Sequence, residues 1–410
     1  MNSKPTMNRG NGALDISLAA PQGWSYIAGD TVIGMVSRHA PIITSEATVK
    51  LALKGRVKIQ VPKGFGASHD RPGPVYKELL IPKCHTLFQG PLHIPDISDS
   101  VYWPFEVGIS PFSQDSAFQV NGDSLPSWDD ICSSRLPGTF YSVGSHPSSS
   151  LSACWVEYYL EAEMRYVQKG EQKVHTSTCP IQVRHTPETI FSGFGKQRRT
   201  LNRSIRGQHL LPAHQEDRSF GRRTREFFIH PSNHAPELHY KVEVYAPATV
   251  QLGNPSNIPY KLKFEILPQT STALRDVELK VLFNSAKFIL RSETKVTTGT
   301  ALHSLSSIHG SRTDLGIEQA FKQLDAFPLM IPLTERSQTL NIGKMLQLTL
   351  HTTGLKAGEK ELSATGLITP NFTTHTLRYL NTLQAEFSVT VAGNTTWLYA
   401  STPLTIIAEM

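Results

Sequence analysis

The sequence predicts an all-β protein of two immunoglobulin-like β-sandwich lobes joined by a basic linker. Between Thr48 and Val61 the apolar side chains occupy the odd positions 49, 51, 53, 57, 59 and 61, and lysines occupy the even positions 50, 54 and 58. This period of two describes a strand with one buried face. The 28 glycines and 27 prolines suit a turn-rich β protein. A chain of 410 residues suits two domains of about 150 to 200 residues each.

The N-terminal half contains strand-like runs in succession. Residues 13–61 predict three strands, with the pair Gly29-Asp30 at the turn into the second. Residues 79–120 add two runs interrupted by prolines, which belong at edges or turns. The run 154–167 alternates again, with Tyr158 and Leu160 on one face and three glutamates on the other. These elements predict one β-sandwich over residues 13–187.

A basic stretch follows. Between Arg184 and Arg225 there are ten Lys and Arg against three Asp and Glu, a local charge of +7 compared with +6 for the whole chain. The stretch is polar and has no periodicity, which predicts an interdomain linker or long loop over residues 188–225.

The basic stretch is also the main candidate for binding. The side chains that would bind an anionic surface are Lys196, Arg198, Arg199, Arg203, Arg206, Arg222, Arg223 and Arg225. A solvated tether without a partner and an anionic membrane are the competing interpretations, while the scarcity of aromatic residues disfavours nucleic acid. Three hydroxyl groups that follow arginines are candidates for phosphorylation, which would offset the charge: Thr200, Ser204 and Thr224.

Residues 226–408 predict a second β-sandwich. Val242 and Val244 share one strand face, and the runs 262–266 and 277–283 repeat the alternation. The segment Leu315 to Leu324 predicts a short helix within a long excursion. Four tryptophans in strand-like runs are expected to anchor the cores: Trp24, Trp103, Trp155 and Trp397.

The sequence contains no recognisable catalytic, metal or cofactor motif. The G-x-S-x-G, H-E-x-x-H and G-x-x-x-x-G-K-[ST] patterns do not occur. The cysteines lie far apart, which predicts thiols and neither zinc ligands nor a disulfide framework: Cys84, Cys132, Cys154 and Cys179. An enzyme with a dispersed active site remains an alternative. No run of about 20 apolar residues and no secretory signal pattern occur, so a cytoplasmic protein is expected.

Four short motifs resemble a known family. The first follows the pattern Y-xx-G-D-x-V-x-G-x-V and spans Tyr26 to Val36. The others are Trp103-Pro104-Phe105-Glu106-Val107, the V-E-Y-x-L-x-A run that starts at Val156, and Pro370-Asn371-Phe372-Thr373-Thr374. Together they resemble the two lobes of arrestins, and in particular the fungal alpha-arrestin-like proteins.

This resemblance implies an adaptor and no enzymatic activity. Such a protein would bind cytoplasmic segments of membrane transporters or receptors, promote their ubiquitination, endocytosis or sorting, and be recruited to the plasma membrane or endosomes. Alpha-arrestins engage HECT-type ubiquitin ligases through PPxY motifs, and this chain has none. Pro74 and Tyr76 form the nearest degenerate candidate for a WW-domain ligand, so direct binding of a ligase is doubtful. A retromer-type sorting or scaffold subunit is the alternative.

Overall fold

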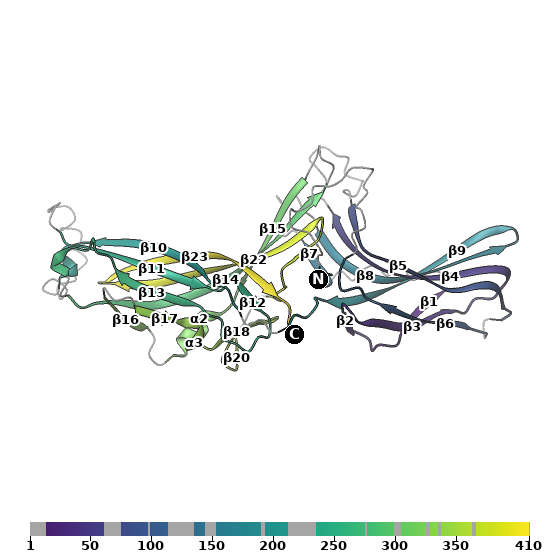
Figure 1. The fold of residues 1–410 in the computed structure, drawn as a ribbon, viewed down its shortest axis with the longest axis horizontal. Coiled ribbons are helices and arrows are strands. Elements are labelled where there is room, and N and C mark those ends of the chain that lie inside the picture. Colours follow the sequence, from purple (N-terminus) through teal and green to yellow (C-terminus); the bar gives the residue numbers. More distant parts are fainter. Residues whose placement is uncertain are drawn as a thin grey trace. The chain divides into compact units, whose positions relative to one another are not determined.

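The computed structural model describes residues 14–60, 75–96, 99–113, 135–143, 153–189, 193–211, 235–274, 277–298, 305–324, 328–334, 338–362 and 366–409. The chain is almost entirely β and divides into two compact units (Figure 1). Unit 1 comprises residues 1–187, 293–309 and 372–379, and unit 2 comprises residues 188–292, 310–371 and 380–410. Within the described ranges, no helix is long and apolar enough to cross a membrane.

Unit 1 is a sandwich of two sheets. One sheet has the order β1-β3-β6, with strands β1 (Asp15–Leu18), β3 (Thr31–Arg38) and β6 (Val101–Gly108). The other has the order β2-β9-β8-β4-β5, with strands β2 (Ser25–Ile27), β9 (Glu171–Arg184), β8 (Ala153–Gln168), β4 (Ile42–Gln60) and β5 (Val75–Ile94), and with β7 (Phe140–Val143) also paired to β8. The inward positions of β4 and β8 are fully buried, as the alternation predicted.

The first motif shapes the entry into β3. Gly29 has φ of 100°, a conformation that side chains resist, and the Asp30 carboxylate accepts the N–H of Ile27 at 2.9 Å. At Gly34 a Cβ would lie 2.3 Å from the carbonyl oxygen of Ser17 and 2.6 Å from the ring of Phe105. The motif therefore has a structural explanation, because its glycines permit a tight turn and a close strand contact.

Unit 2 is a second sandwich. One sheet has the order β10-β11-β13-β17, with strands β10 (Gln197–Arg206), β11 (Glu237–Ala246), β13 (Lys261–Ile266) and β17 (Gln338–Asn341). The facing sheet has the order β12-β23-β22-β14-β15, with strands β12 (Thr249–Gln251), β23 (Asn394–Ile407), β22 (Leu377–Val391), β14 (Leu279–Thr298) and β15 (Leu305–Asp314). Strand β16 (Leu329–Leu333) pairs with β14. Strand β21 (Phe372–Thr373) pairs with β22 and belongs to unit 1, as do residues 293–298 of β14, 305–309 of β15 and 377–379 of β22.

Smaller elements complete the chain. A three-stranded sheet contains β18 (Leu348–His351), β19 (Gly354–Ala357) and β20 (Lys360–Glu361). The short helices are α2 (Ile317–Lys322), α3 (Ile342–Met345), and the 3-10 turns η1 (Gln208–Leu210) and η3 (Thr272–Leu274). Helix α2 lies inside the segment 315–324, which confirms the predicted helix.

The linker prediction over residues 188–225 was wrong for Gln197–Arg206. These ten residues form β10 and pair antiparallel with β11 along their whole length. Leu201 and Ile205 lie on one face of β10 and pack against the core of unit 2, while the polar side chains of this edge strand remain in solvent. The two units part between Pro187 and Glu188. Residues 212–225 lie outside the described part of the chain.

Unit 1 is not one continuous stretch of sequence. Its core includes Phe372 and Tyr379, which stack with ring centroids 5.8 Å apart. Phe140 meets both rings edge-on at 5.1 and 5.0 Å. The predicted range 13–187 therefore omits two segments of the unit, residues 293–309 and 372–379.

The tryptophan prediction holds for Trp103, which is 6% exposed. It is wrong for Trp24 and Trp397, which are 55% and 48% exposed. Trp397 lies in β23, where alternation alone did not reveal which face of the strand is covered, and Trp24 lies outside a strand, just before β2.

Candidate functional site

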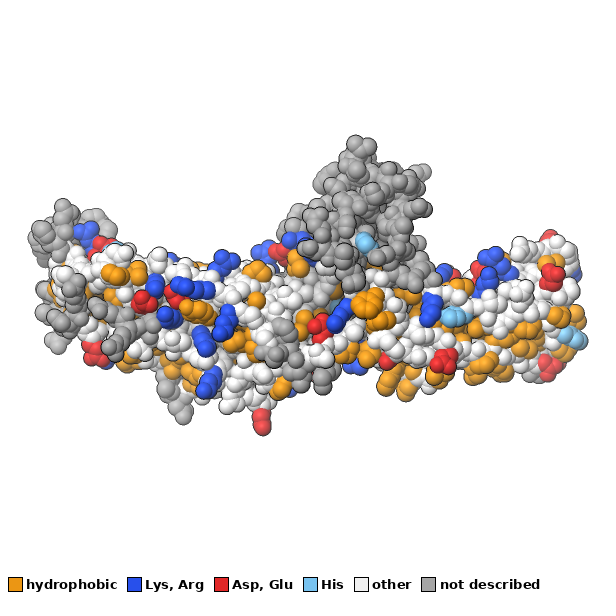
Figure 2. Space-filling view, viewed as in Figure 1, with side chains coloured by type: hydrophobic (Ala, Val, Ile, Leu, Met, Phe, Trp, Pro, Cys, Tyr) orange, Lys and Arg blue, Asp and Glu red, His pale blue; other side chains and the backbone are white. Residues whose placement is uncertain are grey.

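Strand β10 lies at the edge of its sheet and carries four of the eight basic side chains that the sequence singled out. Its even-numbered residues share the outer face with Lys241, Glu243 and Tyr245 of β11. Its odd-numbered residues share the face of Leu201 and Ile205. The outer faces of β10, β11 and β13 therefore form one charged surface. Figure 2 shows basic and acidic side chains intermixed over unit 2.

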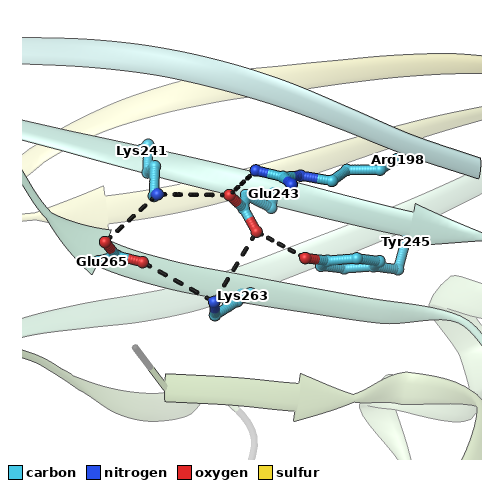
Figure 3. A network of polar contacts seen from close by, with 6 residues as sticks. All are labelled: Arg198, Lys241, Glu243, Tyr245, Lys263 and Glu265. Atoms are coloured by element: carbon cyan, nitrogen blue, oxygen red, sulfur yellow. Dashed lines mark hydrogen bonds and ion pairs between the residues drawn. The ribbon is translucent and has the colours of Figure 1, made fainter. Parts of the chain in front are cut away.

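The centre of this surface is Glu243, which is only 2% exposed (Figure 3). Its Oε1 lies 2.5 Å from Nη2 of Arg198 and 3.4 Å from Nζ of Lys241. Its Oε2 accepts the hydroxyl of Tyr245 at 2.7 Å and lies 3.9 Å from Nζ of Lys263. Both lysines also contact Glu265, at 3.3 and 3.8 Å. A buried carboxylate is thereby surrounded by donors and cations, as burial of a charge requires.

The partners of Glu243 favour its charged form. Burial acts to raise the pKa of Glu243, but the hydrogen bond from Tyr245 and the charges of Arg198 and Lys241 outweigh it and lower that pKa. Donation to Glu243 raises the pKa of Tyr245. Three cations and two carboxylates remain, so the cluster offers a modest positive charge.

The other predicted anion-binding residues divide into three groups. Lys196, Arg199 and Arg206 are exposed, while Arg203 is half-buried and donates from Nη1 to the carbonyl of Asn202 at 3.0 Å. Three arginines lie outside the described residues: Arg222, Arg223 and Arg225.

Two of the predicted phosphorylation sites can be placed. Thr200 and Ser204 are exposed on the outer face of β10, and Thr200 stands directly opposite Glu243 in the register. Thr224 lies outside the described residues. A phosphate on Thr200 would therefore compete with the carboxylate of Glu243 for Arg198.

One residue of the degenerate WW-ligand candidate can be placed. Tyr76 lies in β5 and pairs with Ile59 of β4. A WW domain needs a polyproline II backbone, and a residue in an antiparallel ladder does not offer one. Pro74 lies outside the described residues.

The glutamates of β8 form ordinary ion pairs. Glu161 pairs with Lys54 and Glu157 with Arg56, while Glu163 contacts Arg165 at 2.6 Å. The three glutamates are partly exposed and each has a basic partner, so this strand face is a solvated, counter-charged surface.

Unit 2 also contains a cavity of about 420 Å³. Leu274, Leu279 and Leu333 line it, together with the carboxylates of Glu265 and Glu278. Both carboxylates are engaged by lysines, since Lys280 contacts Glu278 at 3.1 Å. Across the residues that the structure describes, no three His, Cys, Asp or Glu side chains gather to hold a metal ion.

An apolar surface lies on unit 1. Ile33, Met35 and Tyr102 are 52%, 44% and 54% exposed on the outer face of the β1-β3-β6 sheet. Met35 stands between Ser17 of β1 and Pro104 of β6 in the register. Exposed apolar patches of this kind often mark sites of protein contact.

Sequence reasoning did not find Glu243 or its lysines. The signal was present in the alternation of β11 and β13, where Val242, Val244 and Phe264 face inward and the charged residues between them must face outward. None of the models of known protein families matches this chain, and no curated protein matches it in sequence.

Proposed function

We propose that this chain is an arrestin-like adaptor that binds cytoplasmic segments of membrane proteins and promotes their ubiquitination, endocytosis or sorting. The observation that carries the proposal is the pair of β-sandwich units with the arrestin-like motif at the turn into β3, where Gly29, Asp30 and Gly34 each have a structural role. A fold alone does not fix a function, so the surfaces must supply the rest.

Two surfaces support binding as the activity. The exposed apolar face of the β1-β3-β6 sheet suits a protein partner. The basic side chains of β10 suit an anionic partner. Each Lys or Arg near a membrane rich in anionic lipid would contribute about 1 kcal/mol to the free energy of binding. The protein would act in the cytoplasm and be recruited from there to the plasma membrane or endosomes.

The experiment is quantitative co-purification of the tagged chain from detergent-solubilised membranes. Transporters or receptors together with a ubiquitin ligase would support the adaptor. Stable, stoichiometric coat subunits would instead support the retromer-type sorting subunit, which shares the architecture. Recovery of neither class would contradict both proposals and favour an enzyme with a dispersed site.

Membrane recruitment has its own test. Sedimentation with liposomes of increasing anionic lipid content should retain the wild-type chain, and Thr200→Glu with Ser204→Glu should reduce that retention because both positions are exposed on β10. Equal, salt-insensitive binding of both proteins would contradict a role for this strand.

A further inference from the structure

Strand β23 presents an open edge. Residues 394–404 pair with β22, and β12 covers only Thr405 to Ile407 on the other side. Over the stretch from Trp397 to Ser401, no described strand pairs with the second edge. An uncovered strand edge is a template for pairing with another chain.

The backbone groups at this edge can be assigned. Ala392 and Gly393, with φ of 46° and 77°, form a two-residue turn that is closed by Val391 and Asn394. In such a hairpin the closing pair is hydrogen-bonded, so even-numbered residues of β23 bond to β22.

Contacts at the far end of the strand agree. The N–H of Ile406 donates to the side-chain oxygen of Asn371, which also accepts from Asn381 of β22, so this N–H points toward β22. The N–H of Thr405 donates to the carbonyl of Ala248, next to β12, and points the other way. The ladder has no register shift between these ends. The N–H and C=O groups of Trp397, Tyr399 and Ser401 therefore point to the open edge.

This edge lacks the features that usually block pairing. The 14 residues of β23 include no charged side chain. Pro403 is the single edge proline, and its carbonyl is already taken by the side chain of Gln197 at 2.8 Å. Trp397 and Tyr399, 48% and 59% exposed, flank the open groups and offer broad apolar contacts. Strand β10 forms the neighbouring edge of the facing sheet and is protected by four arginines.

We propose that β23 binds an extended polypeptide segment by strand addition, with an uncharged, β-branched centre and acidic residues at its ends. Donors and acceptors that alternate at strand spacing match a peptide backbone, which lipid headgroups and nucleic acid do not provide. This site rests on the geometry of unit 2 and does not depend on the proposed adaptor function.

A basic side chain near the open edge favours a peptide with acidic ends. Gln197 reaches the edge of β23 from the odd-numbered face of β10, and Arg199 is the next residue on that face. Arg199 is exposed and has no ion pair among the described residues. A carboxylate beside the bound strand would complement it. A second copy of this chain would bring the same arginines to the edge, so like charges oppose self-pairing.

The test measures binding of labelled synthetic peptides with an alternating Val and Thr centre and either Asp or Lys at both ends. Fluorescence anisotropy with the full chain should show tighter binding of the Asp-ended peptide. Tyr399→Pro removes one N–H at the open edge. It leaves the β22 ladder intact, because the N–H groups of odd-numbered residues point away from β22, and β23 already has a proline at the odd-numbered position 403. It should weaken binding about tenfold. Tyr399→Thr keeps the N–H, and the peptide should lose only the ring contact.

Charge reversal provides a second, independent variant. Arg199→Glu should reverse the preference between the two peptides, and Arg206→Glu, the same change on the opposite face of β10, should leave it unchanged. Circular dichroism establishes that each variant is folded. Equal binding by wild type and Tyr399→Pro, or tighter binding of the Lys-ended peptide by the wild type, would overturn the proposal. A wild-type dimer that Tyr399→Pro dissociates would assign the edge to a second copy and contradict it as well.

Discussion

Gly29 illustrates how a single residue sets the start of β3. Its φ of 100° is accessible to glycine and costly for residues with a Cβ, although a Cβ there would meet no atom within 4 Å. Gly29→Val should therefore lower the free energy of unfolding by about 1 to 3 kcal/mol through backbone strain alone. Urea denaturation measures the change. Gly366→Ala is the matched control, because this position is also open but has no positive φ. Equal stability of both variants would show that the turn relaxes without cost.

His185 makes unit 1 sensitive to pH. Its Nδ1 accepts the N–H of Gly138 at 3.2 Å, its Nε2 is covered and has no partner among the described residues, and its ring lies 5.5 Å from that of Phe372. Burial lowers the pKa of His185 from 6.5 to about 4. Because the folded pKa is the lower one, the stabilisation is complete above pH 6.5 and is lost as the pH falls toward 4.

His185→Gln should accordingly flatten the pH dependence of stability. Between pH 7.5 and pH 5 the wild type should lose about 2 kcal/mol more than the variant. Chemical denaturation at both pH values gives the two differences. If both proteins lose the same free energy of unfolding between the two pH values, burial does not lower the pKa of His185 in the folded state.

At the scale of elements, the sequence predicted strands wherever a core imposes alternation. In β4 and β8 nearly every second residue is buried, and this pattern is visible without a structure. Strand β10 has only Leu201 and Ile205 as apolar residues, so its strand state depends on pairing with β11, about 40 residues away in sequence. Arg198 was predicted as part of an anion-binding set, but its partner Glu243 lies on that neighbouring strand. Local patterns do not show such a pairing.

The Glu243 cluster allows a prediction about the sheet β10-β11-β13. Glu243→Gln preserves the shape of the side chain and leaves the charges of Arg198, Lys241 and Lys263 uncompensated. The variant should lose about 1 to 3 kcal/mol of unfolding free energy. Glu265→Gln, a control at a carboxylate that is 25% exposed and contacts the same lysines, should lose less.

The salt dependence of stability distinguishes charge repulsion from lost hydrogen bonds as the cause of the destabilisation in Glu243→Gln. Added salt screens repulsion among the cations, so the gap between Glu243→Gln and wild type should narrow as ionic strength rises. A gap that is independent of salt would indicate lost hydrogen bonding, for instance with Tyr245, and not charge.

At the scale of the whole molecule, the two units do not correspond to two successive stretches of sequence. Unit 1 takes residues 293–309 and 372–379 from the C-terminal half, and Phe372, Leu377 and Tyr379 are part of its core. Removing three large apolar side chains from a core costs several kcal/mol, which is a large fraction of the stability of one domain. A fragment of residues 1–187 should therefore fold poorly by itself.

Co-expression of residues 1–187 with residues 188–410 as separate chains tests this arrangement. The two chains should co-purify, because the second supplies the ring cluster that Phe140 packs against. Phe372→Ala with Tyr379→Ala in the second chain should reduce recovery of the first. Trp397→Ala, a large-to-small change at an exposed aromatic, is the control and should leave recovery unchanged. If residues 1–187 alone unfold cooperatively with the stability that unit 1 has in the intact chain, the segment 372–379 is an accessory to this unit and not a part of its core.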